Sequence, residues 1–441
     1  MDQQEIAHLE EQLVGGEKRG DDAGALAQAV VVRLMDLYLD SLKVEQALDL
    51  FNRYSRHFDE DQELALTLKT GQVLTFGEAW DLSLKCFGRC AEICRERGND
   101  AALAEINGFM ATAHRKMGEL ERAMELHQEQ ELLGQRCSDP NQVAAGCAGQ
   151  GVLWEENEDW EPAVEFLARA VKMYRELGNG PALAIVQARL SRADYMDSRD
   201  AVAAVEMLAQ THQLSEEPQI LGRVGETSYL LGLHLCDDGE LDSSMKVLKL
   251  AHRALEKAGD GAGMADCLLG MADVEVAWGK QEEALDHLGR ASKLWEQVGD
   301  RAGLADTYGR IGMVHNRFGR PNEAIQFFGQ AMQILDEIGD REGLASVFHA
   351  IGRLYLEHEA PESGETFMVK AVQTMAALEE PDPGVLARAR RDLAKVYVAL
   401  KKKPDEAMSL MEEARDFYLG EGDADGAADV MEEMDAARET Q

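Results

Sequence analysis

A short glycine-containing sequence recurs along this chain at a nearly constant interval, and it restricts the possible folds more than any other feature. Glycine followed by aspartate occurs at Gly259, Gly299 and Gly339, which lie 40 residues apart. Intact copies also begin at Gly98, Gly178 and Gly422, and altered copies are found at Gly20-Asp21, Phe58-Asp59, Ser138-Asp139-Pro140, Glu217-Pro218 and Pro381-Asp382-Pro383. A fixed period of about 20–50 residues is typical of repeat proteins.

Each copy, which we call a Gly-Asp junction, has the chemistry of a helix end followed by a helix start. Glycine adopts the left-handed conformation that ends a helix without a Cβ clash. The following aspartate or asparagine accepts hydrogen bonds from the free amides of the next helix. The junctions therefore predict helical hairpins that follow one another along the chain.

Within one period, the spacing of small and bulky residues predicts two helices that pack closely. Ile311 and Gly312 share a face of a first helix, Gly319-Arg320-Pro321 forms a turn, and Ala324 and Phe328 share a face of a second helix. The same spacing returns around Gly151, Gly232, Ala272 and Gly352. Small residues at these positions allow two helix backbones to approach, so we expect each glycine at a close crossing.

This pattern resembles the tetratricopeptide repeat (TPR), which places a bulky residue, Leu-Gly, Tyr, Ala, Phe and Ala at these offsets. The period here is about 40 residues rather than the usual 34, as in repeats of the Pins/LGN and rapsyn type and in several bacterial peptide-responsive regulators. The resemblance implies an all-α, right-handed superhelical solenoid of about ten hairpins with a C-terminal capping helix. Terminal repeats of a solenoid need such a polar cap.

The junctions also predict where each part of the chain begins and ends. We expect a leading helix over 1–19 and a capping helix over 422–441. Between them, the solenoid spans 20–421, with repeats near 20–58, 59–98, 99–138, 139–178, 179–218, 219–259, 260–299, 300–339, 340–381 and 382–421. The repeats at 21–58 and 181–218 match the pattern poorly.

Charge and composition narrow the classes of partner. The net charge of −37 over 441 residues argues against binding a nucleic-acid backbone, because the phosphates would be repelled. The same acidity also keeps a long array soluble, or reflects a salt-adapted host. No apolar run is long enough to span a membrane, and the acidic N-terminus does not look like a signal peptide. Seven scattered cysteines fit a reducing cytoplasm.

The sequence shows no motif for catalysis or for a cofactor. Cys86, Cys90 and Cys94 lie four residues apart on one helix face, with His114 and His127 in the next repeat, so a zinc or copper site is an alternative. We favour buried thiols without metal, because Cys90 replaces the alanine of other repeats. Phosphate-loop, zinc-protease and nucleophile-elbow motifs are absent from the sequence. We therefore predict a protein without enzymatic activity, cofactor or metal.

A candidate binding site comes from the positions that line the concave surface in the resembled fold. In the middle repeats these positions are acidic, and include Glu155, Glu156, Glu226, Asp237, Asp266 and Asp273. In the last repeats they form what we call the C-terminal strip, composed of Asn316, Arg317, His349, Arg353, Arg388, Arg391 and Lys395. We predict that this strip binds an acidic segment or terminal carboxylate of a protein or peptide partner. In the alternative, Arg388, Arg391 and Lys395 pair with the acidic helix that follows them, which contains Glu406, Glu412, Glu413 and Asp416.

Together these features favour a cytoplasmic scaffold or adaptor that binds a protein or peptide in its groove. A sensor that responds to a peptide or small ligand is the second hypothesis. The adaptor is preferred because no effector domain is recognisable. An enzyme or metal protein is the third, and it would need a site that the sequence does not show.

Overall fold

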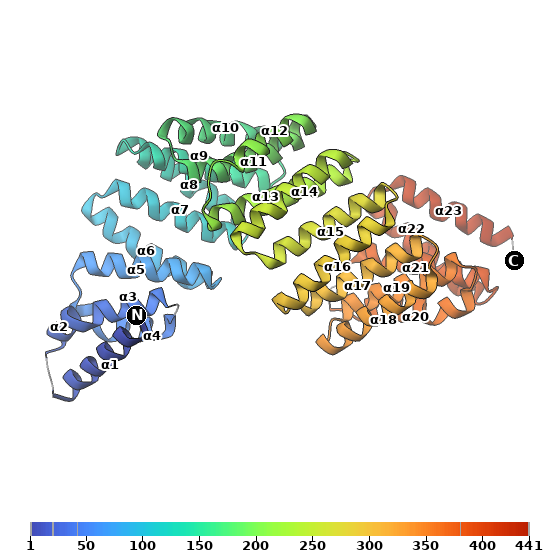
Figure 1. Ribbon diagram of the computed structural model, residues 1–441, viewed down its shortest axis with the longest axis horizontal. Helices are drawn as coiled ribbons and strands as arrows, with labels where there is room; N and C mark the ends of the chain where they lie inside the picture. The colour runs from blue at the N-terminus through green and yellow to red at the C-terminus, as the bar shows by residue number, and fades with distance from the viewer. Residues whose placement is uncertain (1, 20–21, 42, 380, 440–441) are drawn as a thin grey trace. The chain divides into compact units, whose positions relative to one another are not determined.

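A computed structural model describes residues 2–19, 22–41, 43–379 and 381–439, and every regular element in these ranges is a helix (Figure 1). The predicted all-α repeat solenoid is confirmed for this part of the chain. The Gly20-Asp21 junction lies outside the described residues. The chain divides into two compact units, Met1–Ile220 and Leu221–Gln441, and each is described by itself.

Unit 1 begins with single helices and continues as helical hairpins. Its elements are α1 (Asp2–Arg19), α2 (Ala23–Leu26), the π-helix η1 (Ala27–Val31), α3 (Val32–Asp40), α4 (Val44–Tyr54), the 3₁₀-helix η2 (Ser55–His57), α5 (Glu60–Phe76), α6 (Trp80–Arg97), α7 (Asp100–Lys116), α8 (Leu120–Arg136), α9 (Pro140–Glu156), α10 (Trp160–Leu177), α11 (Gly180–Ser198) and α12 (Ala201–Thr211). The repeat near 179–218, whose sequence matches the repeat pattern poorly, also differs in structure from the repeat before it. Its second helix, α12, is several residues shorter than α10.

Unit 2 contains the more regular half of the array and ends on a single helix. Its elements are α13 (Pro218–Asp237), α14 (Leu241–Ala258), α15 (Gly261–Ala277), α16 (Gln281–Val298), α17 (Arg301–Arg317), α18 (Pro321–Ile338), α19 (Arg341–Glu357), α20 (Pro361–Ala376), α21 (Pro383–Ala399), α22 (Pro404–Gly420) and α23 (Ala424–Glu439). We call the surface formed by the first helices of these hairpins, α13, α15, α17, α19 and α21, the first-helix face.

The Gly-Asp junctions act as predicted from their chemistry. Gly259, Gly299 and Gly339 end α14, α16 and α18 with φ angles of 77°, 82° and 75°, in the left-handed region. The aspartates that follow cap the next helices. Asp260 accepts a hydrogen bond from the backbone amide of Gly263 at 3.0 Å. In the same way, Asp300 accepts one from Gly303, and Asp340 accepts one from Gly343.

The predicted close crossings are confirmed at all four glycines. A Cβ atom added at Gly151, Gly232, Gly312 or Gly352 would lie 2.6–2.8 Å from a side chain of the second helix in the same hairpin. The neighbour is in each case 16 residues further along the chain, at Leu167, Leu248, Phe328 and Met368. One repeating contact between a glycine and a large apolar side chain therefore joins the two helices of these hairpins.

Candidate functional site

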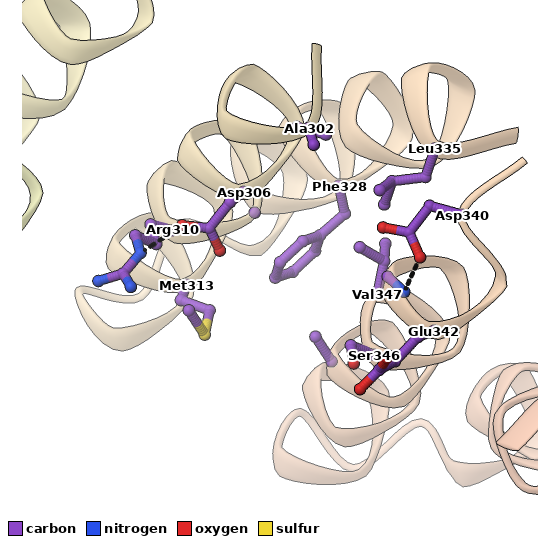
Figure 2. Close-up of a pocket in the computed structure, with 14 residues that line it drawn as sticks. Ala302, Asp306, Arg310, Met313, Phe328, Leu335, Asp340, Glu342, Ser346 and Val347 are labelled. Atoms are coloured by element: carbon purple, nitrogen blue, oxygen red, sulfur yellow. Dashed lines mark hydrogen bonds and ion pairs between the residues drawn. The ribbon is translucent and has the colours of Figure 1, made fainter. Parts of the chain in front are cut away.

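Unit 2 has a pocket of about 380 Å³ on its first-helix face, between α17 and α19 (Figure 2). The apolar side chains of Phe328 and Leu335, from α18, and of Val347, from α19, line its interior. We call it the α17–α19 pocket, and its full lining is Ala302, Ala305, Asp306, Gly309, Arg310, Met313, Phe328, Leu335, Asp340, Glu342, Gly343, Ser346, Val347 and Ala350.

Charged groups surround this apolar interior. Asp306 and Arg310 come from α17, and Glu342 and Ser346 come from α19 (Figure 2). The Nε of Arg310 donates to Asp306 at 2.8 Å, and its Nη1 donates to Asp273 of α15 at 2.8 Å. Burial opposes the charge of Arg310, yet Asp273 and Asp306 raise the pKa of its guanidinium. Arg310 is thus a cation already paired with the chain's own carboxylates.

Met313 shows that the pocket offers apolar surface to solvent. Its side chain lines the pocket and is 53% exposed, although Met is usually buried. Gly309 leaves further space, because no atom lies within 4 Å of the position that its Cβ would occupy.

A second pocket, of about 340 Å³, lies between α13 and α15. We call it the α13–α15 pocket, and its lining is Glu226, Tyr229, Leu230, Leu255, Asp260, Ala262, Gly263 and Asp266. Each of these residues lies 80 positions before a residue that lines the α17–α19 pocket. Leu255 corresponds to Leu335, and Asp260 to Asp340. The two pockets are therefore the same site of the fold, two repeats apart.

Asp266 is a carboxylate of the α13–α15 pocket whose pKa is shifted by its surroundings. Burial, together with the nearby negative charges of Asp260, Asp306 and Asp300, raises the pKa of Asp266 above its usual value, against the opposing effect of Arg310. In the described part of the chain, Asp266 forms no ion pair within 4.0 Å.

The repeat between these two pockets has a tryptophan in the corresponding place. Trp295 of α16 occupies the position of Leu255 and Leu335, and it is only 5% exposed. Its ring lies 2.6 Å from the site where Gly303 of α17 would have a Cβ, so the indole packs directly against α17. The indole Nε1–H is buried and has no hydrogen-bond acceptor among the described residues.

The structure brings part of the C-terminal strip together around one carboxylate, Asp392 of α21. His349 Nε2 is 2.9 Å from Asp392, Arg353 Nε is 4.0 Å from it, and Lys395 Nζ is 3.7 Å from it. Burial of Asp392 is outweighed by these three neighbours, which lower the pKa of its carboxyl group. His349, Arg353 and Lys395 are thus partly neutralised by their own chain.

Arg391 is the most strongly paired member of the strip. Its guanidinium donates to Glu433 of α23 at 2.9 and 2.5 Å, and Lys395 lies 3.0 Å from the same carboxylate. Hydrogen bonding to Glu433 raises the pKa of Arg391, and only 19% of its side chain is exposed. The alternative explanation was that the strip's cations pair with carboxylates of their own chain. Arg391 does so, but its partner is Glu433 of α23 and not one of the predicted residues, Glu406, Glu412, Glu413 and Asp416. In α22, Glu413 pairs instead with Arg390 at 3.1 Å.

The other members of the strip are more accessible. Asn316 donates to Glu357 at 2.8 Å and its side-chain oxygen lies 3.0 Å from His358 Nε2. Arg317 and Arg388 are exposed, and neither makes an ion pair in the described part of the chain. These two arginines are therefore the cations of the strip that are best placed to meet a ligand.

Sequence reasoning did not select the pockets, although it covered some of their positions. Asp306, Gly309, Met313 and Ser346 occupy positions that line the concave surface in the resembled fold. They were not predicted as site residues, because the C-terminal strip was selected for its positive charge. Residue size at one position does not mark the site, because Gly309 lines one pocket and Tyr229 lines the equivalent one.

The cysteines are buried among apolar neighbours. Cys90 and Cys94 are buried and Cys86 is half-buried. Burial raises the pKa of Cys86 and of Cys94, and it raises the pKa of Cys90 to about 12, so these thiols are protonated at neutral pH. Among the described residues, no group of three His, Cys, Asp or Glu side chains has the arrangement of a metal site.

Comparison with known proteins identifies the repeat. The family described as "Tetratricopeptide repeat" matches residues 303–366, which include all residues that line the α17–α19 pocket except Ala302. No curated protein matches the sequence. None of the helices in the described ranges combines the length and apolar character needed to cross a bilayer.

Several solved structures are similar to this chain, and the one with a TM-score above 0.5 supports the fold. A signal-transduction ATPase with a TPR sensor, from Pyrococcus horikoshii, is 15% identical with a TM-score of 0.54, over 87% of this chain and 57% of that one. The apo quorum sensor NprR from B. thuringiensis is 11% identical with a TM-score of 0.48, over 78% and 97% of the two chains. Apo RapI is 14% identical with a TM-score of 0.47, over 78% and 96%. The chain therefore contains a stretch, residues 303–366, that matches the tetratricopeptide repeat, within an all-α solenoid fold.

Proposed function

We propose that this chain is a non-catalytic module that binds a protein or peptide segment on the first-helix face of unit 2. The α17–α19 pocket carries the proposal. Its volume of about 380 Å³ is in the range of ligand sites, and it combines an apolar interior with a few charged groups at its edge. Such a combination buries one large side chain of a ligand and orients the chain around it.

The state of the charged groups supports binding rather than catalysis. Arg310 is paired with Asp273 and Asp306, and Asp340 caps α19 by accepting a hydrogen bond from Gly343. Groups held in this way fix the shape and charge of a surface, whereas general acids and bases need a proton to move. Binding is also the step that an adaptor and a peptide-responsive sensor have in common.

Narrowing the pocket is expected to weaken ligand binding without unfolding the protein. Gly309→Tyr places a side chain in the pocket that the equivalent position already has at Tyr229, and there is open space around Gly309. Peptides selected from a random 12-residue phage library on the full chain should bind this variant at least tenfold more weakly, which is about 1.4 kcal/mol. Fluorescence anisotropy with the selected synthetic peptides provides the measurement.

Gly329→Tyr is the matched control. Gly329 is also a helical glycine with no atom within 4 Å of its Cβ position, but it belongs to α18 and does not line the pocket. The control should bind the selected peptides as the unmodified protein does. Equal affinity for both variants, or failure to enrich any peptide, would contradict the proposed site.

We also propose that the C-terminal strip receives an acidic segment or the terminal carboxylate of the same ligand. The exposed guanidinium groups of Arg317 and Arg388 support this, because arginine binds a carboxylate through two parallel hydrogen bonds. Arg391 is a poor choice for a test, since it fastens α23 to α21. Arg317→Glu combined with Arg388→Glu should leave stability nearly unchanged.

The expected result is a loss of discrimination between peptide ends. The unmodified protein should bind selected peptides with a free C-terminus about tenfold more tightly than their C-terminal amides. The double variant should bind both forms with similar, weaker affinity. If the unmodified protein shows no preference for the free carboxylate, and acidic substitutions in the peptide change nothing, the strip is not a ligand site.

A further inference from the structure

The charge on the first-helix face of unit 2 changes sign from one end of the face to the other. The change is clearest at the sixth residue of each first helix, which is Asp266 in α15, Asp306 in α17, Ser346 in α19 and Arg388 in α21. In α13, the residue one period before Asp266 is Glu226. Since equivalent residues of stacked repeats form a row along one surface, this row runs from negative through neutral to positive.

The helices at the two ends of the face show the same contrast over their whole length. The sequence of α15 contains Asp266, Asp273 and Glu275 and no lysine, arginine or histidine. The sequence of α21 contains a single carboxylate, Asp392, and four basic residues, which are Arg388, Arg390, Arg391 and Lys395. The face therefore has an acidic end, formed by α13 and α15, and a basic end, formed by α21.

At both ends, some of the charged groups have no partner in the protein. At the acidic end, Glu226, Asp237 and Asp266 make no ion pair within 4.0 Å in the described part of the chain, and Glu226 and Asp237 are exposed. At the basic end, the same holds for the exposed Arg388. The middle of the face is partly neutralised, because Arg310 is bound to two carboxylates.

Contacts between neighbouring first helices make the face one continuous surface. The side-chain contacts are Arg310 with Asp273 at 2.8 Å between α17 and α15, Asn316 with Glu357 at 2.8 Å between α17 and α19, and His349 with Asp392 at 2.9 Å between α19 and α21. Helices α13 and α15 line the α13–α15 pocket together. Packed helices lie about 8–10 Å apart, so four steps from α13 to α21 cover about 32–40 Å. An extended peptide covers this distance in about ten to twelve residues.

A surface with opposite charges at its ends favours a ligand with the opposite arrangement. Basic side chains are attracted to α13 and α15, and a negative group is attracted to α21. A ligand lying in the other direction would bring like charges together at both ends. If the negative group is the terminal carboxylate that we assign to the C-terminal strip, the ligand chain must run from α13 towards α21.

We propose that the ligand of unit 2 is the C-terminal segment of a partner protein, with basic residues about ten to twelve positions before its terminal carboxylate, and that it runs from α13 to α21. The inference rests on the proposed binding function and adds the direction and the charge pattern of the ligand. The basic side chains lie against Glu226, Asp237 and Asp266, and the carboxylate lies at Arg317 and Arg388.

Two peptides of the same composition test the charge pattern. Both are 16-residue peptides of serine, glycine and alanine with a central leucine for the α17–α19 pocket, a neutral fluorescent label on the N-terminus and a free C-terminus. The separated peptide has two arginines about eleven positions before the carboxylate, and the adjacent peptide has them two positions before it. Anisotropy with the full chain should give a Kd at least tenfold lower for the separated peptide. The difference should shrink at high salt, because the ion pairs are screened.

A variant of the acidic end tests where the arginines lie. In the unmodified protein, replacing both arginines of the separated peptide with serine should raise the Kd at least tenfold. Glu226→Lys combined with Asp237→Lys reverses two exposed charges of α13. In this variant the same change to the peptide should alter the Kd less than twofold, whereas amidation of its C-terminus should still weaken binding.

A variant of the basic end gives the opposite result. Arg317→Glu combined with Arg388→Glu should remove the effect of amidation but keep the effect of the two arginines. Together, these two variants determine the direction of the peptide, because each end of the protein responds to only one end of the ligand.

Glu296→Lys combined with Asp336→Lys is the matched control for the acidic end. It changes the net charge of the protein by the same amount, at exposed positions of the second helices α16 and α18. The separated peptide should bind this control and the unmodified protein with the same Kd, and should depend on its arginines in both. Circular dichroism of all variants would confirm that they are folded.

The outcomes separate this inference from the proposed function. Equal affinity for the separated and adjacent peptides, no binding by the separated peptide, or full dependence on the arginines in Glu226→Lys/Asp237→Lys, would overturn the inference. If phage-selected peptides lose affinity on Gly309→Tyr but do not depend on basic residues far from their C-terminus, the binding function holds and the proposed direction is wrong. If Gly309→Tyr has no effect on selected peptides, the binding function itself fails.

Discussion

Gly146→Ala is expected to destabilise the protein by about 3 kcal/mol. Gly146 lies in α9, where a Cβ would be 2.8 Å from the backbone nitrogen of Glu131 and 2.8 Å from the carbonyl oxygen of His127, both in α8. Neither backbone atom can rotate away as a side chain could, so α8 and α9 must separate. For a unit of this size the thermal midpoint should fall by about 6–12 °C in calorimetry of the full chain.

Gly88→Ala provides the matched control for this prediction. Gly88 is also a helical glycine of unit 1, but no atom lies within 4 Å of its Cβ position. Alanine there should stabilise α6 by about 0.5–1 kcal/mol, because it loses less backbone entropy than glycine on folding. Similar midpoints for Gly88→Ala and Gly146→Ala would show that α8 and α9 do not approach as closely in solution.

The second large effect expected is the release of the last helix, α23, when its ion pair with α21 is removed. Arg391 and Glu433 form two hydrogen bonds, and their side chains are only 19% and 26% exposed. Arg391→Ala leaves the Glu433 carboxylate poorly solvated and with a single cation, Lys395. The loss of about 2 kcal/mol should speed hydrogen exchange of the amides in α23 roughly 30-fold.

The same contact should depend on pH in a defined direction. Burial of Glu433 is outweighed by hydrogen bonds from Arg391 and Lys395, so the pKa of its carboxyl group is lowered below 4.5 in the folded protein. A lowered pKa means that the stabilisation is complete above pH 4.5 and is lost as the pH falls through the folded value. Protection of the α23 amides, measured as exchange relative to the intrinsic rate at each pH, should therefore fall below pH 4.5 in the unmodified protein but much less in Arg391→Ala.

Arg438→Ala is the control for the release of α23. Arg438 pairs with Asp435 within the same helix, and both side chains are more than half exposed, so little stability should be lost. If Arg391→Ala exchanges in α23 as slowly as this control does, the apolar contacts of Val430 and Met434 hold the helix without the ion pair.

The fold was predictable because its signals are local and repeated. A glycine that must take positive φ, followed by an aspartate that caps a helix, specifies each junction within a few residues. The pairing of Gly312 with Phe328 likewise follows from a fixed spacing within one hairpin. Where the repeat has degenerated these signals fail, as at the short helix α12 and at the π-helix η1.

The pockets were not predictable in the same way, because they depend on what neighbouring repeats place opposite one another. Leu255 and Leu335 align as equivalent large apolar residues, and the sequence alone does not say that a pocket lies beside each of them. The partner of Arg391 illustrates the same limit. Glu433 lies 42 residues away on a helix whose docking position the pattern does not specify.

The uniform Gly-Asp junction has a consequence for how a chain of this kind changes length. Deleting residues 300–339 would join Gly299 to Asp340, and the new connection would again be a glycine followed by a capping aspartate. Because helices pack mainly against their neighbours in sequence, such a deletion creates one new interface of a kind already present. Gene segments of one period can therefore be lost or duplicated with little cost to folding. The length of the first-helix face can then change by one helix at a time while every junction keeps the same chemistry.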